Sequence, residues 1–221
     1  MRSFDDIRAI AAERKGGAAA LDALLAPDPD APDIATLSDD RILATMARCI
    51  FQSGFNWKVV EAKWPGFEAG FDGFDPGRVA LYGDDDLDRL LADTGVIRNG
   101  AKLSAVIENA GWVTQLARDH GSARAFFADW PADDQVGLMQ AMAKRGSRLG
   151  GNTGQYVLRF IGRDSFILSR DVVARLTAEG VIDGPATGKR AQAAIQAAFN
   201  TWAAESGRSL REISRTLAYS V

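Results

Sequence analysis

The sequence contains a single cysteine, Cys49, and a single histidine, His120, among its 221 residues. A disulfide within the chain is therefore impossible. A cysteine–histidine zinc site needs three or four such ligands, and a cubane iron–sulfur cluster usually needs four cysteines. A catalytic pair built on histidine would have to use His120, whose Arg-Asp-His-Gly-Ser context is typical of a helix end. We therefore expect no metal site and no cofactor.

The chain also lacks a long hydrophobic run. No apolar stretch approaches the roughly 20 residues that cross a bilayer, and residues 1–17 contain no apolar segment ahead of a cleavage site. We expect a cytoplasmic monomer with no membrane partner. With 47% hydrophobic residues, the length suits one domain, or two small lobes around a shared core.

Charge is unevenly distributed along the chain. The formal net charge is −3, yet residues 144–221 contain 12 lysines and arginines against 6 acidic residues. The remaining residues contain 14 basic and 23 acidic side chains. A polyanion responds to the local field rather than to the total charge. The C-terminal third is therefore a candidate for nucleic-acid binding, and the alternative is that these residues lie by chance on solvated helix faces.

The hydrophobic pattern is helical almost throughout. Ile42, Leu43, Met46 and Ile50 have the three-to-four spacing of one buried helix face. No alternating run is long enough to build a sheet, and Ser209 with Glu212 forms a capping-box pair. Pro65-Gly66 predicts the end of a helix that begins after Asn56. We predict an all-α protein of about ten helices, with later helices over 84–93, 101–119, 123–129, 133–144, 153–161, 169–179, 188–205 and 209–219.

Two segments differ from ordinary amphipathic helix. In residues 48–58, Gly54 permits a bend that Phe51, Phe55 and Trp57 flank. Aromatic side chains around a flexible turn suit the stacking of a flat ligand. The alternative is that these rings belong to the core at a helix junction.

The second segment covers residues 144–156, where a basic helix end runs into a glycine-rich hairpin. Asn152 or Thr153 is expected to cap the next helix. Glycines let the backbone approach a phosphate, and a helix N-terminus offers free N–H groups. Nearby positive charge comes from Lys144, Arg145 and Arg148. The alternative is a purely structural turn.

Together these segments resemble the 3-methyladenine DNA glycosylase I family, within the helix-hairpin-helix DNA glycosylase superfamily. The matching motifs are Gln-Ser-Gly-Phe-Asn-Trp (52–57), residues 67–76, residues 88–102, Ile-Glu-Asn-Ala (107–110) and Lys-Arg-Gly at 144 with its hairpin. The resemblance implies an all-α, two-lobed fold that binds DNA through the hairpin and flips a damaged base into a cleft. It divides one glycosylase unit, 1–221, into a divergent N-terminal segment (1–37), a mainly helical lobe with the base pocket (38–143), and the hairpin with basic C-terminal helices (144–221).

The resemblance also implies site residues. The expected base pocket consists of Cys49, Gln52, Phe55, Trp57 and Tyr156, and Phe55 is alternatively a wedge that fills the gap in the duplex. The residues expected to hold the DNA backbone are Lys144, Arg148, Gly150, Gly151, Asn152 and Thr153.

Three departures from the family pattern stand out. Family members typically hold zinc with cysteine and histidine near both termini, and this chain has neither there. Helix packing of Ile195, Phe199 and Trp202 is expected to replace that tie.

Eight residues before Trp57, where the family has a base-contacting glutamate, this chain has Cys49. An ungapped match aligns Arg170 with the position of the superfamily's catalytic aspartate, and Asp171 follows one residue later. Asp171 is our catalytic candidate, and the alternative is a surface charge favoured by the helix dipole.

These features predict a monofunctional glycosylase acting on alkylated purines such as 3-methyladenine in double-stranded DNA. A cationic lesion leaves without protonation, and aromatic faces attract it. A lyase would need a lysine just upstream of the catalytic aspartate, and none lies between residues 145 and 188. The alternatives are a non-catalytic protein of the same fold that binds damaged or bent DNA, and a helical protein whose hairpin is only structural.

Overall fold

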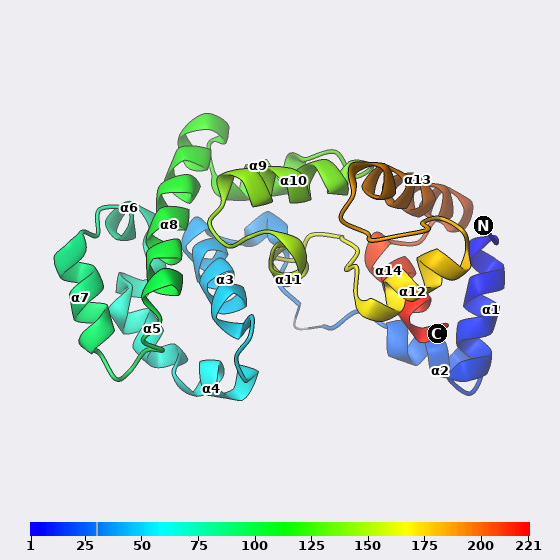
Figure 1. Cartoon of the computed structure of the whole chain (residues 1–221), viewed down its shortest axis with the longest axis horizontal. Coiled ribbons are helices and arrows are strands. Elements are labelled where there is room, and N and C mark those ends of the chain that lie inside the picture. The colour runs from blue at the N-terminus through cyan, green and yellow to red at the C-terminus, as the bar shows by residue number, and fades with distance from the viewer. Residues whose placement is uncertain (30) are drawn as a thin grey trace. The chain divides into compact units, whose positions relative to one another are not determined.

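A computed structural model describes residues 1–29 and 31–221, and this part of the chain is all-helical, without a strand (Figure 1). The all-α prediction is confirmed. The described residues form fourteen α-helices and two 3₁₀-helices, more than the ten expected, because several are only one or two turns long. They are α1 (Phe4–Arg14), α2 (Ala18–Leu25), η1 (Ile34–Thr36), α3 (Asp39–Gln52), α4 (Trp57–Ala62), α5 (Trp64–Gly70), η2 (Asp72–Phe74), α6 (Pro76–Val79), α7 (Asp84–Ala92), α8 (Gly100–His120), α9 (Ala123–Asp129), α10 (Gln135–Arg145), α11 (Gly151–Phe160), α12 (Arg170–Ala178), α13 (Lys189–Ser206) and α14 (Leu210–Tyr219).

The chain divides into two compact units that are not continuous in sequence. The terminal unit contains residues 1–31, 131–137 and 164–221, and the central unit contains residues 32–130 and 138–163. The hairpin between α10 and α11 therefore shares a unit with α3 and α8. The basic helices α12–α14 share the other unit with α1 and α2.

The central unit is built around α3. This helix packs against α8 and α11, and its buried face contains Ile42, Leu43, Met46 and Ile50, as the spacing predicted. A ladder of stacked rings extends the core: the ring centroids of Trp64 and Phe74 lie 5.3 Å apart. This packing holds the C-terminal end of α3. Residues 53–56 follow it and join α3 to α4, and we call them the aromatic turn.

One predicted helix end in this unit is wrong. Pro65-Gly66 does not stop a helix; α5 begins at Trp64, with Pro65 in its first turn. Proline is tolerated there because the first-turn N–H groups have no partner within the helix. Gly66 is required for packing, since a Cβ atom at this position would collide with the backbone of Gly95.

The terminal unit packs α1, α12, α13 and α14 together. Phe166 and Phe199 stack with centroids 4.2 Å apart, and Ile195, Phe199 and Trp202 are fully buried, in line with their expected packing role. The predicted capping box at the start of α14 is present, with Ser209 Oγ accepting from the N–H of Glu212 at 3.1 Å.

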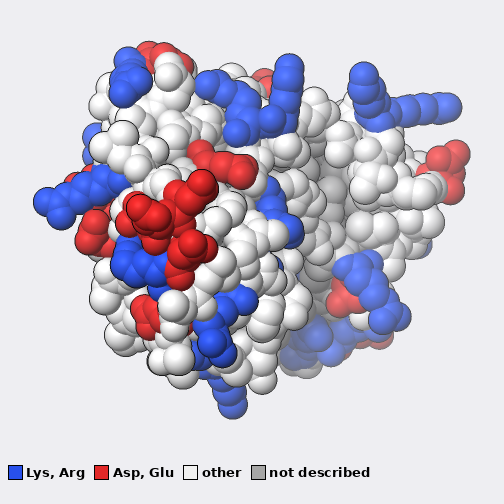
Figure 2. Space-filling model, turned by 60° about the vertical axis from the view of Figure 1, so that its left-hand side comes forward, with Lys and Arg blue, Asp and Glu red and all other residues white. Residues whose placement is uncertain are grey.

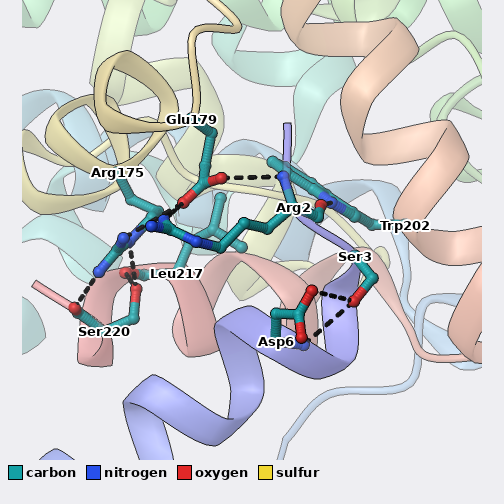
Figure 3. Close-up of polar contacts among 8 residues, drawn as sticks. All are labelled: Arg2, Ser3, Asp6, Arg175, Glu179, Trp202, Leu217 and Ser220. Atoms are coloured by element: carbon teal, nitrogen blue, oxygen red, sulfur yellow. Dashed lines mark hydrogen bonds and ion pairs between the residues drawn. The ribbon is translucent and has the colours of Figure 1, made fainter.

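The N- and C-terminal segments are both tied to the end of α12 (Figure 3): Arg2 bonds to Glu179, which follows this helix, and Ser220 bonds to Arg175 within it. Arg2 donates to Glu179 from its backbone N–H at 2.9 Å and from Nη1 at 2.7 Å. Arg175 donates to Glu179 at 3.2 Å and, through Nε, to the Ser220 hydroxyl at 2.7 Å. Trp202 Nε1 donates to the carbonyl of Arg2 at 3.1 Å. Buried charges thus join the N- and C-terminal segments within this unit.

Among the helices that the structure describes, none combines the length and the apolar character needed to cross a membrane.

Candidate functional site

The aromatic turn joins α3 to α4 in the central unit. Gly54 has a positive φ of 77°, and Asn56 caps α4 by accepting from the N–H of Lys58 at 2.9 Å, as predicted. Phe51 is a core residue, whereas Phe55 and Trp57 are 41% and 47% exposed. The alternative that all three rings are core therefore holds for Phe51 alone.

A small cavity lies beside this turn, and we call it the aromatic cavity. Its volume is about 130 Å³, and its lining residues are Cys49, Gln52, Ser53, Trp57, Asn152, Thr153 and Tyr156. The structure thus brings together four of the five residues expected in the base pocket. Phe55 does not line the cavity. Asn152 and Thr153, expected on the DNA backbone, line it as well.

Aromatic rings form one side of the aromatic cavity. The ring of Trp57 meets that of Tyr156 edge-on, with centroids 5.9 Å apart. Phe160, one turn further along α11, lies 6.2 Å from Trp57 and stacks with Tyr156 at 5.8 Å. Sequence analysis missed Phe160, although its spacing of four residues from Tyr156 places both on one helix face.

The polar side of the cavity includes Gln52, which is 7% exposed. Its Nε2 donates to Glu61 Oε1 at 3.0 Å. Arg48 Nε lies 3.6 Å from the same Glu61 oxygen, and its guanidinium lies 4.2 Å from the centroid of the Trp64 ring. Gln52 and Glu61 therefore form a hydrogen-bonded pair, and the positive charge of Arg48 lies beside the same carboxylate oxygen.

Cys49 does not replace a carboxylate electrostatically. Burial raises the pKa of its thiol to about 12, an effect only partly opposed by the positive charge of Arg48. The thiol is therefore neutral at physiological pH. None of the lining residues of the aromatic cavity carries a charge.

The hairpin between α10 and α11 is fastened to α8. The side chain of Asn109 donates to the carbonyl of Ser147 at 2.9 Å and accepts from its N–H at 2.8 Å. Arg148 has a positive φ of 57°, unusual for a residue with a side chain, and its Nε donates to the carbonyl of Ala101 at 3.2 Å. These bonds fix the hairpin against the first half of α8.

The predicted cap of the next helix is wrong. Helix α11 begins at Gly151, and Gly150 is its N-cap residue without a side-chain hydrogen bond. Neither Asn152 nor Thr153 caps it, because glycine reaches the required backbone geometry and starts the helix earlier. The first N–H groups of α11 consequently have no side-chain cap.

A second cavity, here the cationic cavity, lies next to the first. Its volume is about 370 Å³, and its lining residues are Ile50, Ser53, Lys102, Arg148, Gly150 and Thr153. Ser53 and Thr153 line both cavities. Lys144 lies exposed in the last turn of α10 and lines neither of the two.

Lys102 was not predicted as a site residue. It is 7% exposed, and its ammonium donates to the carbonyls of Ser53 at 2.6 Å and Phe51 at 3.3 Å. It also lies 4.6 Å from the centroid of the Phe55 ring. Burial, and then the charge of Arg148, lower its pKa. Lys102 thus stabilises the end of α3 and the start of the aromatic turn through two hydrogen bonds to backbone carbonyls.

Acidic side chains gather elsewhere on the central unit. Helix α7 carries Asp84, Asp85 and Asp86 in its first turn, followed by Asp88. Figure 2 shows a patch of carboxylates on the face turned toward the viewer, with lysines and arginines around it. No carboxylate is among the residues that line the aromatic or the cationic cavity.

Asp171 lies in the terminal unit. It is exposed in the first turn of α12, where Ser169 caps the helix by accepting from the N–H of Val172 at 3.3 Å. The catalytic role of Asp171 stays a prediction.

The residues that the structure describes include no candidate zinc site. Among the described residues, no three histidine, cysteine or acidic side chains lie close enough to hold a metal ion. Cys49 lines the aromatic cavity. His120 ends α8, as its sequence context predicted, with its ring 5.2 Å from that of Phe126.

Comparison with known proteins identifies the class. The model of the methyladenine glycosylase family matches residues 34–154, and the chain belongs to this family. The chain is 37% identical over 68 residues to DNA-3-methyladenine glycosylase 1 of Escherichia coli (strain K12). That match covers 31% of this chain and 36% of the relative, so it spans about a third of the relative's length.

Solved structures support the same fold. A crystal structure of 3-methyladenine DNA glycosylase I matches with a TM-score of 0.50 and 26% identity, covering 60% of this chain and 81% of the other. The Staphylococcus aureus 3-methyladenine DNA glycosylase I matches with a TM-score of 0.52 and 19% identity, covering 60% and 81%. At 19% identity, the likeness to the Staphylococcus aureus structure concerns the fold alone.

Proposed function

We propose that this protein excises alkylated purines of the 3-methyladenine type from double-stranded DNA by hydrolysing the N-glycosidic bond. The observation that supports this most is the aromatic cavity: an uncharged cavity that Trp57 and Tyr156 line together, in a chain of the methyladenine glycosylase family. A damaged nucleotide flipped from the duplex would place its base there.

The chemistry of the lesion fits this cavity. A purine alkylated on a ring nitrogen carries positive charge in DNA, so the base leaves without a general acid. The aromatic faces of Trp57 and Tyr156 attract such a cation. An uncharged, partly aromatic cavity therefore suits a cationic lesion, while offering little to help an intact base depart.

DNA would bind across the hairpin. The uncapped N–H groups at the start of α11, from Gly150 through Thr153, suit a phosphate. Arg148 and Lys144 would add positive charge. Phe55, half exposed and outside the aromatic cavity, fits the wedge that fills the gap in the duplex better than a wall of the base pocket.

For catalysis we assign Asp171 as the carboxylate that stabilises the oxocarbenium-like sugar in the transition state. The assignment rests on its position after the hairpin and in the first turn of α12. The enzyme would be monofunctional, with water as the nucleophile. The buried Lys102 supports this, because its ammonium already donates to two carbonyl groups.

A second candidate is a non-catalytic protein that binds damaged or bent DNA. The observation in its favour is that no carboxylate lines the aromatic cavity. The two functions predict opposite results for base release, while both predict DNA binding.

The test measures released bases and DNA affinity on the same methylated duplex, with wild type beside Asp171→Asn. We expect wild type to release base and Asp171→Asn to bind an abasic-site duplex equally well while releasing base at least tenfold more slowly. Leu81→Ala, at a highly exposed position on neither cavity, is the matched control. Equal release by Asp171→Asn would reject the role of Asp171, and binding without release by wild type would favour the second candidate.

A further inference from the structure

The exposed ring of Phe55 is carried by a flexible joint. Phe55 follows Gly54, whose positive φ of 77° favours glycine and where an added Cβ atom would meet nothing within 4 Å. The joint therefore restrains the ring little by itself. The neighbouring Trp57 is held by the rings of Tyr156 and Phe160. Phe55 needs a restraint from elsewhere if its ring is to keep one direction.

Lys102 provides that restraint, because its ammonium contacts the chain on both sides of Gly54. Before the glycine, Nζ donates to the carbonyls of Phe51 at 3.3 Å and Ser53 at 2.6 Å. After the glycine, Nζ lies 4.6 Å from the centroid of the Phe55 ring, within the range of cation–π attraction. This attraction is stronger where the cation is shielded from water, and Lys102 is 7% exposed. One buried cation therefore bridges the flexible joint.

A long helix holds Lys102 in its own place. Lys102 lies in the first turn of α8, which has 21 residues, and its backbone N–H donates to the side chain of the Asn99 cap at 3.2 Å. The hairpin fastens the same turn, since Arg148 Nε donates to the carbonyl of Ala101 at 3.2 Å. The position of the ammonium is therefore set by α8 rather than by the aromatic turn.

We propose that Lys102 is a positioning residue for base flipping: it holds the Phe55 ring in the direction from which the ring enters the duplex and fills the gap left by the flipped nucleotide. A ring that is fixed before binding costs less to order on the DNA than a ring on a free joint. In this role Lys102 acts through Phe55 rather than on the reacting atoms. This inference rests on the proposed function, because it takes Phe55 as the wedge.

A double-mutant cycle tests the inference. Base release from methylated duplex DNA is measured for wild type, Lys102→Met, Phe55→Ala and the double variant. Lys102→Met keeps an unbranched side chain and removes the charge. We expect about tenfold slower release from each single variant, and no further loss when Lys102→Met is added to Phe55→Ala. A merely structural role of Lys102 would make the two losses multiply.

Two controls separate this role from a general loss of stability. Lys102→Arg keeps a cation that contacts the ring and donates to carbonyls, so its release rate should stay within about threefold of wild type. Lys63→Met removes another lysine of the central unit, whose ammonium donates to the carbonyl of Thr94 instead, and should release base at the wild-type rate. Thermal melts establish that each variant is folded at the assay temperature.

Insertion of the Phe55 ring is measured separately from activity. The probe is 2-aminopurine placed beside an abasic-site analogue in a duplex, because its fluorescence rises when the neighbouring base stack is opened. At saturating protein, wild type should raise the fluorescence. Phe55→Ala and Lys102→Met should each lose roughly half of this rise or more, since the ring is absent in the first and unrestrained in the second.

The outcomes distinguish the inference from the proposed function. Losses that multiply in the cycle, or a fluorescence rise that is unchanged in Lys102→Met, would overturn the inference while base release by wild type stands. A wild type that produces no rise would overturn it as well. No base release by wild type, together with a rise that depends on both Lys102 and Phe55, would reject the proposed activity alone.

Discussion

In the terminal unit, the carboxylate of Glu179 is 2% exposed and accepts hydrogen bonds from Arg2 and Arg175. In the central unit, the equally well buried amide of Gln52 keeps an acceptor without a donor. The first arrangement closes on itself and joins the chain ends. The second belongs to the lining of the aromatic cavity and leaves an acceptor without a donor. The terminal unit therefore pairs these buried polar groups internally, whereas the lining of the aromatic cavity leaves one of them unpaired.

The largest effect is expected from breaking the closed arrangement. Glu179→Ala removes the partner of the buried Arg175 and should lower the free energy of unfolding by about 3 kcal/mol. Chemical denaturation of wild type and variant measures this. We call Arg2, Arg175 and Glu179 the Glu179 cluster. A change below about 1 kcal/mol would show that this cluster contributes little to the stability of the terminal unit.

Trp57→Ala should act on function and spare stability. Stacking a base on an aromatic ring contributes about 1–3 kcal/mol, so base release should fall about 10- to 100-fold. The melting temperature should change little, because Trp57 is 47% exposed. Val59→Ala, exposed on the same helix, is the matched control. Full release by Trp57→Ala would show that the aromatic cavity is not the base site.

The Glu179 cluster should also respond to acid. Burial alone would raise the pKa of Glu179, but its hydrogen bonds with Arg2 and Arg175 outweigh burial and lower it. A depressed carboxyl pKa contributes stability that is present above the unfolded-state value and lost as pH falls through the folded-state value. The stability difference between wild type and Glu179→Gln should therefore be constant above about pH 5 and shrink in more acidic solution. A difference that stays constant down to pH 3 would contradict this.

Lys102→Met should cost less than the loss of Glu179. The substitution removes two hydrogen bonds to carbonyls, but it leaves no buried carboxylate unpaired. We expect a loss of about 1 kcal/mol in the free energy of unfolding. Lys102→Arg serves as the control that keeps the charge. A loss as large as that of Glu179→Ala would mean that both units depend equally on paired charge.

The smallest effect concerns the hairpin. Arg148→Ala should weaken DNA binding to all sequences alike and reduce the slope of log affinity against log salt by about 1. Fluorescence anisotropy with a labelled duplex at several salt concentrations measures this slope. An unchanged slope would show that Arg148 contacts no phosphate.

Local patterns predicted much of this molecule. The spacing of apolar residues identified the buried face of α3, and Ser209 with Glu212 identified the start of α14. Two predictions from local patterns were wrong. Pro65 does not end a helix but lies in the first turn of α5, and α11 starts at Gly151, before the predicted caps Asn152 and Thr153. Both positions involve proline or glycine, whose effect depends on the surrounding packing.

Contacts between distant residues explain what sequence analysis missed. A lysine within a helical run is ordinarily solvated, and only the end of α3 beside it makes Lys102 a buried donor. The spacing of Arg175 and Glu179 suits a helical ion pair, yet their partners Arg2 and Ser220 come from opposite ends of the chain. The nearness of Trp57 and Tyr156 followed from the family resemblance rather than from any local pattern.

Above all, we propose that the aromatic cavity receives the base that this protein excises from DNA. The most direct test of this claim is mass spectrometry of the bases that wild type releases from methylated duplex DNA in the presence of a metal chelator. We predict that more 3-methyladenine is released with the protein than from the same methylated DNA incubated without it. No released base, together with tight binding of an abasic-site duplex, would contradict the claim and identify a damage-binding protein instead.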